Sequence, residues 1–225
     1  MTQPTLIIAD DHPLFRAALR EVVARQLSGA QIIEVSSLDA LQRAIADHPD
    51  SDLILLDLRM PGARGLSSLL HLRAEYPTVP IVVVSASEDA CVVQRTLDFG
   101  ASGFIPKSAS IETIGESLRT VLDGGISAPQ LPERRTRAEE QDRELARRLS
   151  TLTPQQLKVL VMLAEGQSNK DIAGHLAITE ATVKAHITGV LRKLGIERRT
   201  QAAILAQRLM QTGNRADIDG FDDEN

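Results

Sequence analysis

The chain has 225 residues, of which 43% are hydrophobic and 24% are charged, a balance typical of one large or two small globular domains. Its lone cysteine, Cys91, excludes an internal disulfide, and no apolar run approaches the roughly 18 residues that a membrane span needs. Since the first thirty residues also lack a signal-peptide pattern, we expect a cytoplasmic protein that does not associate with a membrane.

The net charge of −5 is distributed unevenly along the chain. Residues 1–125 hold 10 Lys and Arg against 16 Asp and Glu, whereas residues 151–210 hold 8 against 4. The final segment, 211–225, holds 1 against 5. A basic module therefore stands between two acidic ones, which suits nucleic-acid binding but does not establish it without a motif.

The first 125 residues alternate short apolar runs with longer amphipathic stretches. The apolar runs predict strands at 5–9, 31–35, 52–56, 81–84 and 103–105. The amphipathic stretches predict helices near 13–27, 38–46, 65–75, 88–98 and 110–122. Almost continuous apolarity is typical of parallel strands that are buried on both faces. We predict an α/β domain over 1–125: a flavodoxin-like, doubly wound, five-stranded parallel sheet in the order 2-1-3-4-5.

Residues 126–150 lose this pattern and are interpreted as a charged linker. Pro129 and Pro132 interrupt regular structure, and a run of mixed charge follows them. Opposite charges at helical spacing predict a solvated helix, with a flexible tether as the alternative. The pairs that favour a helix are Glu140 with Arg143, and Glu144 with Arg147 and Arg148.

Residues 151–211 carry a capping signal at almost every helix boundary. The signals are the N-cap residues Thr153, Ser168 and Thr179, with Gln156 at a capping-box position and Gly195 at a C-terminus. A last helix is predicted near 200–210. We therefore predict an all-α helix-turn-helix domain, followed at 212–225 by an acidic tail that we expect to be disordered.

Polar residues directly follow the predicted strands of the first domain: Asp10, Asp11, Asp57, Ser85 and Lys107. Because ligands of open parallel sheets bind outside the carboxyl ends of the strands, we expect three carboxylates to converge in one crevice. Clustered anions need a cation, and oxygen ligands favour Mg²⁺. This chemistry suits phosphoryl transfer to Asp57, with Lys107 pairing with one phosphoryl oxygen and Ser85 donating to another. Each residue taken singly also fits a cap, a turn or a solvated charge.

Four motifs in this domain resemble the receiver domains of bacterial two-component response regulators: IADDHP at 8–13, LLDLRMP at 55–61, VSA at 84–86 and GASGFIPK at 100–107. The resemblance covers residues 1–125. It implies that Asp57 is the phosphoacceptor and that Asp11, Asp57 and the backbone carbonyl of Arg59 bind the metal, with Asp10 acting through water.

The same resemblance assigns Ser85 and Phe104 to the switch positions and Lys107 to the lysine position. Phe104 stands where relatives commonly have tyrosine, so a switch step that uses a phenol hydroxyl is in doubt here. A plain core role is the alternative for Phe104.

The helix predicted after Thr179 has two different faces. Val183, Ile187, Val190, Leu191 and Leu194 share one face and predict the core. The other face carries the candidates for the major groove, namely Thr182, Lys184, Ala185, Thr188 and Arg192. Arg192 and four further cations are expected at the DNA backbone: Lys170, Lys193, Arg198 and Arg199. The alternative is that these cations are only solvated surface charges.

Residues 151–195 closely resemble LuxR-type DNA-binding domains through TLTP at 151–154, EGQSNKDIA at 165–173, ITEATVKAH at 178–186 and LRKLG at 191–195. Together the two domains resemble the NarL/FixJ response regulators. The resemblance implies a sensor histidine kinase and double-stranded promoter DNA as partners, RNA polymerase as a further candidate, and a homodimer when the protein is phosphorylated or bound to DNA. Lys184, Ala185 and Thr188 match its base-facing positions, and the last helix often provides a dimer interface.

Two residues of this domain call for comment. Relatives usually have glutamate where Gln156 stands, but glutamine still suits a capping box. His186 has no partner at metal-ligand spacing, so we interpret it as a partly buried structural histidine.

Two other functions are open at this point. A phosphatase that forms an aspartyl-phosphate would usually need a second acid two residues after the nucleophile, where this chain has Arg59. The helix-turn-helix domain could instead dock only proteins. We favour a phosphorylation-switched DNA-binding regulator that turns over no substrate.

Overall fold

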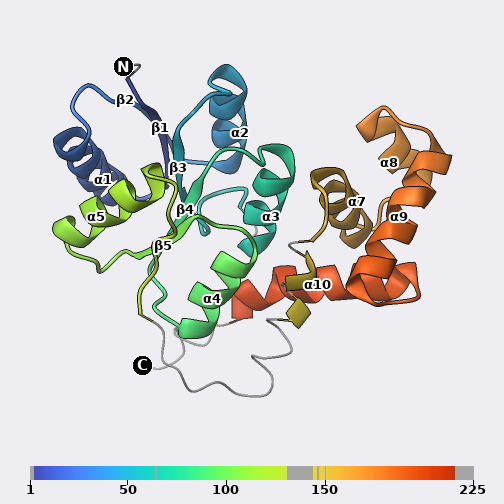
Figure 1. Ribbon diagram of the computed structural model, residues 1–225. Helices are drawn as coiled ribbons and strands as arrows, with labels where there is room; N and C mark the ends of the chain where they lie inside the picture. The colour runs from blue at the N-terminus through green and yellow to red at the C-terminus, as the bar shows by residue number, and fades with distance from the viewer. Residues whose placement is uncertain (1–2, 64, 131–143, 146, 150, 216–225) are drawn as a thin grey trace, which may run out of the picture. The chain divides into compact units, whose positions relative to one another are not determined.

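The computed structural model describes residues 3–63, 65–130, 144–145, 147–149 and 151–215. Five parallel strands form one sheet (Figure 1). They are β1 (Thr5–Ala9), β2 (Gln31–Val35), β3 (Leu53–Asp57), β4 (Ile81–Ser85) and β5 (Gly103–Pro106). Their order, β2-β1-β3-β4-β5, confirms the prediction.

The central strands β3 and β4 are buried at every position. This agrees with their apolar sequences, because a strand that is covered on both faces has no solvent side. The register pairs Asp57 with Val84 and Ser85 with Pro106. The carboxyl ends of the strands therefore lie along one edge of the sheet, where the loops that follow them meet.

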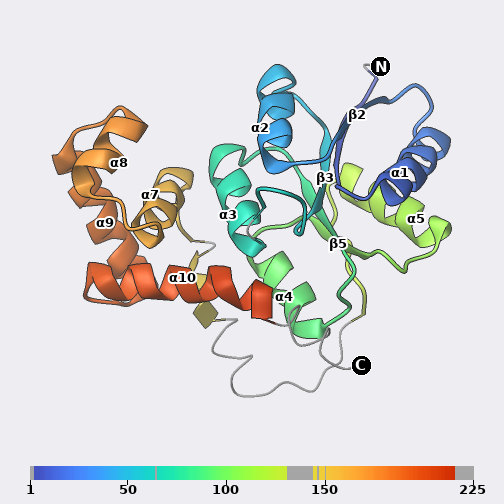
Figure 2. The same cartoon turned by 180° about the vertical axis from the view of Figure 1, so that it is seen from behind.

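The strands alternate with helices in the chain. These are α1 (Pro13–Gln26), α2 (Leu38–Asp47), α3 (Leu66–Glu75), α4 (Ala90–Asp98) and α5 (Ile111–Leu122). Figures 1 and 2 show α1 and α5 side by side on one face of the sheet. Leu19 of α1 and Leu118 of α5 pack there with alternate residues of the strands in one hydrophobic cluster. Helices α1, α2 and α5 begin near the predicted positions. Pro13 stands in the first turn of α1, and Ser37 and Ser110 accept N-cap hydrogen bonds at the starts of α2 and α5.

The C-terminal region is entirely helical within the described part of the chain, as predicted. It contains α7 (Pro154–Ala164), α8 (Asn169–Leu176), α9 (Glu180–Leu194) and α10 (Arg199–Arg215). Thr153 and Gln156 form the predicted capping box. Val159, Ile172, Val183 and Ile187 belong to its core cluster.

The predicted apolar face of α9 is confirmed. Val183, Ile187, Val190 and Leu194 are buried, and Leu191 is half-buried against the same core. Between α8 and α9, Ala177 adopts a left-handed conformation with φ of 52°.

Only parts of the predicted linker are described. Glu144 pairs with Arg147 and Arg148, and hydrogen bonds from these two arginines lower its pKa to about 2. The pair Glu140 with Arg143 lies outside the described residues. Near the C-terminus, α10 continues to Arg215, beyond the predicted end near residue 210, and residues 216–225 also lie outside the described part.

The described elements divide into two compact units. One holds the five strands with α1, α2, α4 and α5, and the other holds α3 with α7 to α10. The domain boundaries at 125 and 150 stay predictions. Among the described helices, none combines the length and the apolar character that crossing a membrane requires.

Candidate functional site

The predicted carboxylates converge at the carboxyl ends of β1 and β3. Asp10 follows β1 directly and Asp57 is the last residue of β3, and their exposed fractions are only 1% and 2%. The Lys107 ammonium reaches them from beyond β5, with Nζ 2.9 Å from Asp10 Oδ2 and 2.8 Å from Asp57 Oδ2. The parallel order of β1 and β3 thus brings together residues that are 47 positions apart in the chain.

Lys107 compensates part of the negative charge in this cluster. Burial favours the neutral amine, but the hydrogen bonds and charges of Asp57 and Asp10 outweigh burial, so the pKa of Lys107 is raised above its ordinary value. Its Nζ also lies 5.1 Å from the centre of the Phe15 ring, within cation–π range. Lys107 is therefore a fixed cation at neutral pH, and a single ammonium faces several carboxylates.

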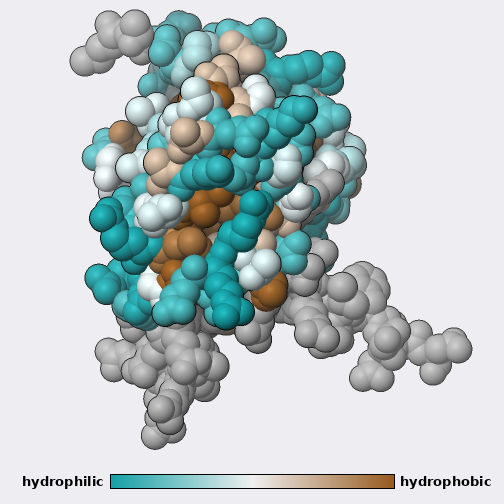
Figure 3. Space-filling model, turned by 90° about the vertical axis from the view of Figure 1, so that its right-hand side faces the viewer, coloured by the Kyte–Doolittle hydropathy of each residue, from teal (hydrophilic) through white to brown (hydrophobic). Residues whose placement is uncertain are grey.

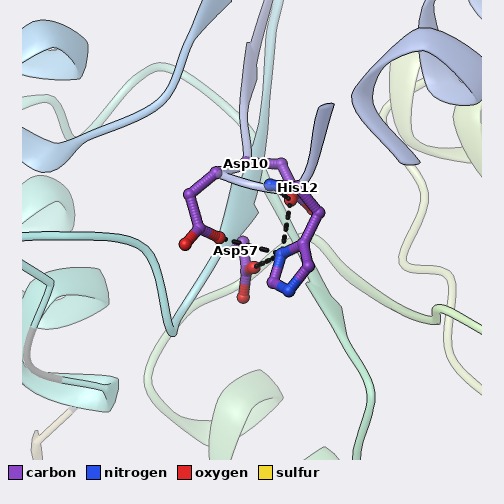
Figure 4. Close-up of side chains that lie close together, drawn as sticks. Asp10, His12 and Asp57 are labelled. Atoms are coloured by element: carbon purple, nitrogen blue, oxygen red, sulfur yellow. Dashed lines mark hydrogen bonds and ion pairs between the residues drawn. The ribbon is translucent and has the colours of Figure 1, made fainter. Parts of the chain in front are cut away.

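His12 also belongs to this cluster, although its residue type and position alone predicted no function for it. Its Nδ1 lies 3.1 Å from Asp10 Oδ1, 2.8 Å from Asp11 Oδ1 and 3.7 Å from Asp57 Oδ2. Figure 4 shows Asp10, His12 and Asp57 turned toward one another. The side chain of His12 is 62% exposed, so it stands at the open side of the cluster. Its place immediately after Asp11 is the one signal in the sequence that could have indicated this role.

The donor set fits a divalent cation. One ligand atom each from Asp10, Asp11, His12 and Asp57 lies within 4.8 Å of all the others. Asp11 Oδ1 is buried and, despite the nearby His12 nitrogen, accepts no hydrogen bond from the described residues. A buried carboxylate oxygen without a donor is costly unless a cation binds it. The pocket of Asp10, Asp11 and Asp57 is thus consistent with a metal site.

Two further predicted residues, Arg59 and Ser85, lie at the same end of the sheet, and a third, Phe104, lies inside β5. The Arg59 backbone amide donates to Asp57 Oδ1 at 2.9 Å. Ser85 is 5% exposed, and its hydroxyl oxygen accepts a hydrogen bond from the backbone amide of Ser87. Phe104 is 1% exposed and lies within β5, so its ring is a full part of the core in this structure. The metal-binding role of the Arg59 carbonyl and the switch roles of Ser85 and Phe104 stay predictions.

The polar face of α9 is open to solvent. The residues of this face that are exposed are Thr182, Lys184, Ala185, Thr188 and Arg192. Figure 3 views the molecule from the side of α8 and α9, where hydrophilic residues border a group of hydrophobic ones. His186 is half-buried and joins no cluster of metal-ligating side chains found in the described residues, consistent with the structural interpretation.

Two of the expected DNA-backbone cations have partners within the second unit. Lys193 Nζ donates to the carbonyl of Thr151 at 2.6 Å and to Gln156 Oε1 at 2.8 Å. The guanidinium of Arg199 donates to Asn169 Oδ1 and to the carbonyl of Gln167. These bonds tie α9 to the start of α7, and α10 to the start of α8. Lys170 and Arg198 are exposed.

Comparison with protein-family models agrees with this geometry. Residues 6–119 match the response regulator receiver domain, and residues 150–206 match the bacterial regulatory proteins of the luxR family. The chain is a response regulator of the NarL/FixJ family. As a member of this two-component family it is a DNA-binding transcriptional regulator controlled by phosphorylation, and not a catalytic enzyme.

Relatives match this response regulator over most of their length. A glycerol metabolism activator of Pseudomonas putida is 41% identical over 207 residues, which cover 89% of this chain and 94% of that protein. The nitrate/nitrite response regulator NarP of Escherichia coli K12 is 35% identical, with coverage of 89% and 93%. Among solved structures, RcsB of Salmonella enterica serovar Typhimurium bound to a promoter has a similar fold. Its TM-score is 0.51 at 22% identity, and the match covers 92% of this chain and all of that one.

Proposed function

We propose that Asp57 is the residue whose phosphorylation controls this response regulator and that a sensor histidine kinase supplies the phosphoryl group. The observation that carries the proposal is the position of Asp57, a buried carboxylate at the carboxyl end of β3 that contacts Lys107. An oxygen of Asp57 attacks the phosphorus, and the bond from phosphorus to the donor nitrogen breaks. Lys107 is then placed to pair with a phosphoryl oxygen.

Asp11, Asp57 and the backbone carbonyl of Arg59 would hold Mg²⁺, with Asp10 acting through water. Bound there, the ion would neutralise charge on the phosphoryl oxygens. The buried, hydrogen-bond-free Asp11 Oδ1 supports this ligand set. His12 contacts the same carboxylates at the open side of the cluster.

Phosphorylation would be sensed through Ser85 and Phe104. The Ser85 hydroxyl is free to donate to a phosphoryl oxygen, because its bond to the Ser87 amide uses it only as an acceptor. A shift of Ser85 would then change the packing around Phe104, which is already buried. This change would favour a second conformation of the surface of the receiver domain.

The output would be binding of double-stranded promoter DNA as a homodimer. The exposed face of α9 would enter the major groove, with Lys184, Ala185 and Thr188 toward the bases. Thr182 would lie at the edge of this face, and Arg192, Lys170 and Arg198 would contact the phosphate backbone. For Lys193 and Arg199 we propose that structural support of the domain comes first, since both already have partners within it.

The replacement Asp57→Asn tests the phosphoacceptor. The variant should accept no phosphoryl group from acetyl phosphate, as followed by phosphate-affinity gel electrophoresis, and the donor should no longer change its DNA affinity. Asp50→Asn is a matched control, because Asp50 is exposed and precedes β3 at the opposite end of the strand. An Asp57→Asn protein that still responds fully to the donor would refute the assignment.

A further inference from the structure

The loop that carries Asp10 and Asp11 is held by Arg16, a residue outside the acidic cluster. Arg16 Nη1 donates a hydrogen bond of 2.6 Å to the backbone carbonyl of Asp10. The Nε of the same guanidinium lies 3.2 Å from Glu34 Oε2. The Arg16 side chain is 20% exposed, so both contacts are shielded in part from water. One side chain of α1 thus connects the acidic loop to β2.

The backbone of Glu34 is held in the sheet. It lies within β2 and is the strand neighbour of Ile8 in β1, two residues before Asp10. A second arginine, Arg20, reaches the other oxygen of Glu34 at 3.3 Å but makes no contact with the loop that we find in the structure. Both arginines therefore contact Glu34, but of the two only Arg16 has a described contact with the Asp10 carbonyl.

The backbone of Asp10 is fixed on both sides. Its amide donates to the carbonyl of Val35 in β2 at 3.1 Å, and its carbonyl accepts from Arg16. Its side-chain Oδ1 accepts from the amide of His12 at 2.8 Å. Without Arg16, the carbonyl at the turn from β1 into the loop would lose a charge-assisted hydrogen bond, which is about twice as strong as a neutral one.

We propose that Arg16 is a positioning residue for the phosphoryl-transfer site, acting through the backbone of Asp10 to hold the two loop carboxylates toward Asp57. The inference rests on the proposed role of Asp57 and Mg²⁺. Carboxylates that repel one another move apart unless the backbone restrains them. The planar fork of arginine can hold a carbonyl and a carboxylate together, whereas the single ammonium of lysine lacks this geometry.

The test compares Arg16→Gln with Arg20→Gln in the full-length protein. Both variants lose a charge and a contact with Glu34, but only Arg16→Gln loses the bond to the Asp10 carbonyl. Affinity for Mg²⁺ alone is measured by ¹⁵N NMR titration, and amide hydrogen exchange of residues 10–12 is measured without Mg²⁺. Thermal unfolding of both variants separates a local effect from a general loss of stability.

We expect Arg16→Gln to weaken Mg²⁺ binding on the order of tenfold, as for other residues that orient metal ligands. Exchange at residues 10–12 should accelerate in the same variant. Arg20→Gln should match the wild type in both measurements, and Arg16→Lys should recover only part of the affinity. Equal Mg²⁺ affinity and equal exchange in Arg16→Gln and Arg20→Gln would overturn the proposal.

The two kinds of measurement also separate this inference from the proposed function. Exchange at residues 10–12 reports on the Arg16 contact whether or not Asp57 accepts a phosphoryl group. Normal exchange in Arg16→Gln would overturn the positioning role even if Asp57 is phosphorylated. A wild-type protein that binds no Mg²⁺ and takes no phosphoryl group would refute the function of the site, and with it the role of Arg16 in that function.

Discussion

At the start of α7, single residues accept hydrogen bonds from Lys193, a cation expected at DNA. Lys193 donates to the carbonyl of Thr151 and to Gln156 Oε1, and that same oxygen accepts from the amide of Thr153. The Gln156 side chain also lies close to Gly189 of α9: a Cβ added at Gly189 would be 2.7 Å from Gln156 Nε2. Gln156 thus joins the helix cap to α9, and its side chain would have to shift if residue 189 carried a Cβ.

Replacing Gln156 with glutamate should stabilise the protein. Both acceptors of the Lys193 ammonium are neutral, and a carboxylate would convert one bond into an ion pair worth about 0.5–1 kcal/mol at this partly exposed position. We expect a higher midpoint of thermal unfolding for Gln156→Glu at pH 7. The gain should disappear as the pH falls and the new carboxylate is protonated.

Gln155→Glu is the matched control for this change. It adds the same charge in the same first turn of α7, so the interaction with the helix dipole is closely similar. Lys193 does not bond to residue 155 in the contacts that the structure describes. An equal gain from both substitutions would attribute the effect to the helix dipole and not to Lys193.

At the scale of elements, the turn between α8 and α9 sets the direction of α9. Ala177 ends α8 with φ of 52°, a conformation in which the Cβ of an L-residue is crowded. Thr179 then begins α9 by accepting a hydrogen bond from the amide of Thr182. A short left-handed turn followed by an N-cap leaves α9 with its apolar face on the core and its polar face exposed.

Ala177→Gly should raise the free energy of unfolding by up to about 1 kcal/mol. Glycine removes the strain of the left-handed conformation, and the gain is reduced by its greater freedom in the unfolded chain. Chemical denaturation measures the change. Ala181→Gly, within the first turn of α9, should have the opposite sign because a helical glycine costs about 1 kcal/mol. A loss of stability in Ala177→Gly would show that the strain is not relieved by glycine.

Across the whole molecule, charge is divided between the two functions of a response regulator. Residues 1–125, which hold the proposed phosphorylation site, carry an acidic excess, whereas residues 151–210 carry more cations than anions. Long-range attraction to DNA follows from the basic segment, and it weakens as salt screens it. The net charge of the chain, −5, conceals this division.

Lys184→Ala should weaken DNA binding without unfolding the domain, because Lys184 is an exposed residue of α9. If the lysine meets a phosphate, the slope of log affinity against log salt concentration should fall by about 0.9. Fluorescence anisotropy with labelled duplex DNA at several salt concentrations measures this slope. Arg43→Ala removes an exposed cation of α2 in the first unit and should leave the slope unchanged. An unaltered slope and affinity in Lys184→Ala would remove this lysine from the interface.

Pattern alone determined the order of strands and helices, the buried face of α9 and the convergence of Asp10, Asp57 and Lys107. These features follow from the period of apolar residues and from the shared edge of parallel strands, both of which are local or topological. Tertiary structure alone decided that His12 borders the carboxylates, that Arg16 holds the Asp10 carbonyl and that Lys193 bonds to Gln156, 37 residues away. Periodicity identifies the face on which a residue lies, but the partner of a long polar side chain depends on which atoms folding brings within hydrogen-bond distance.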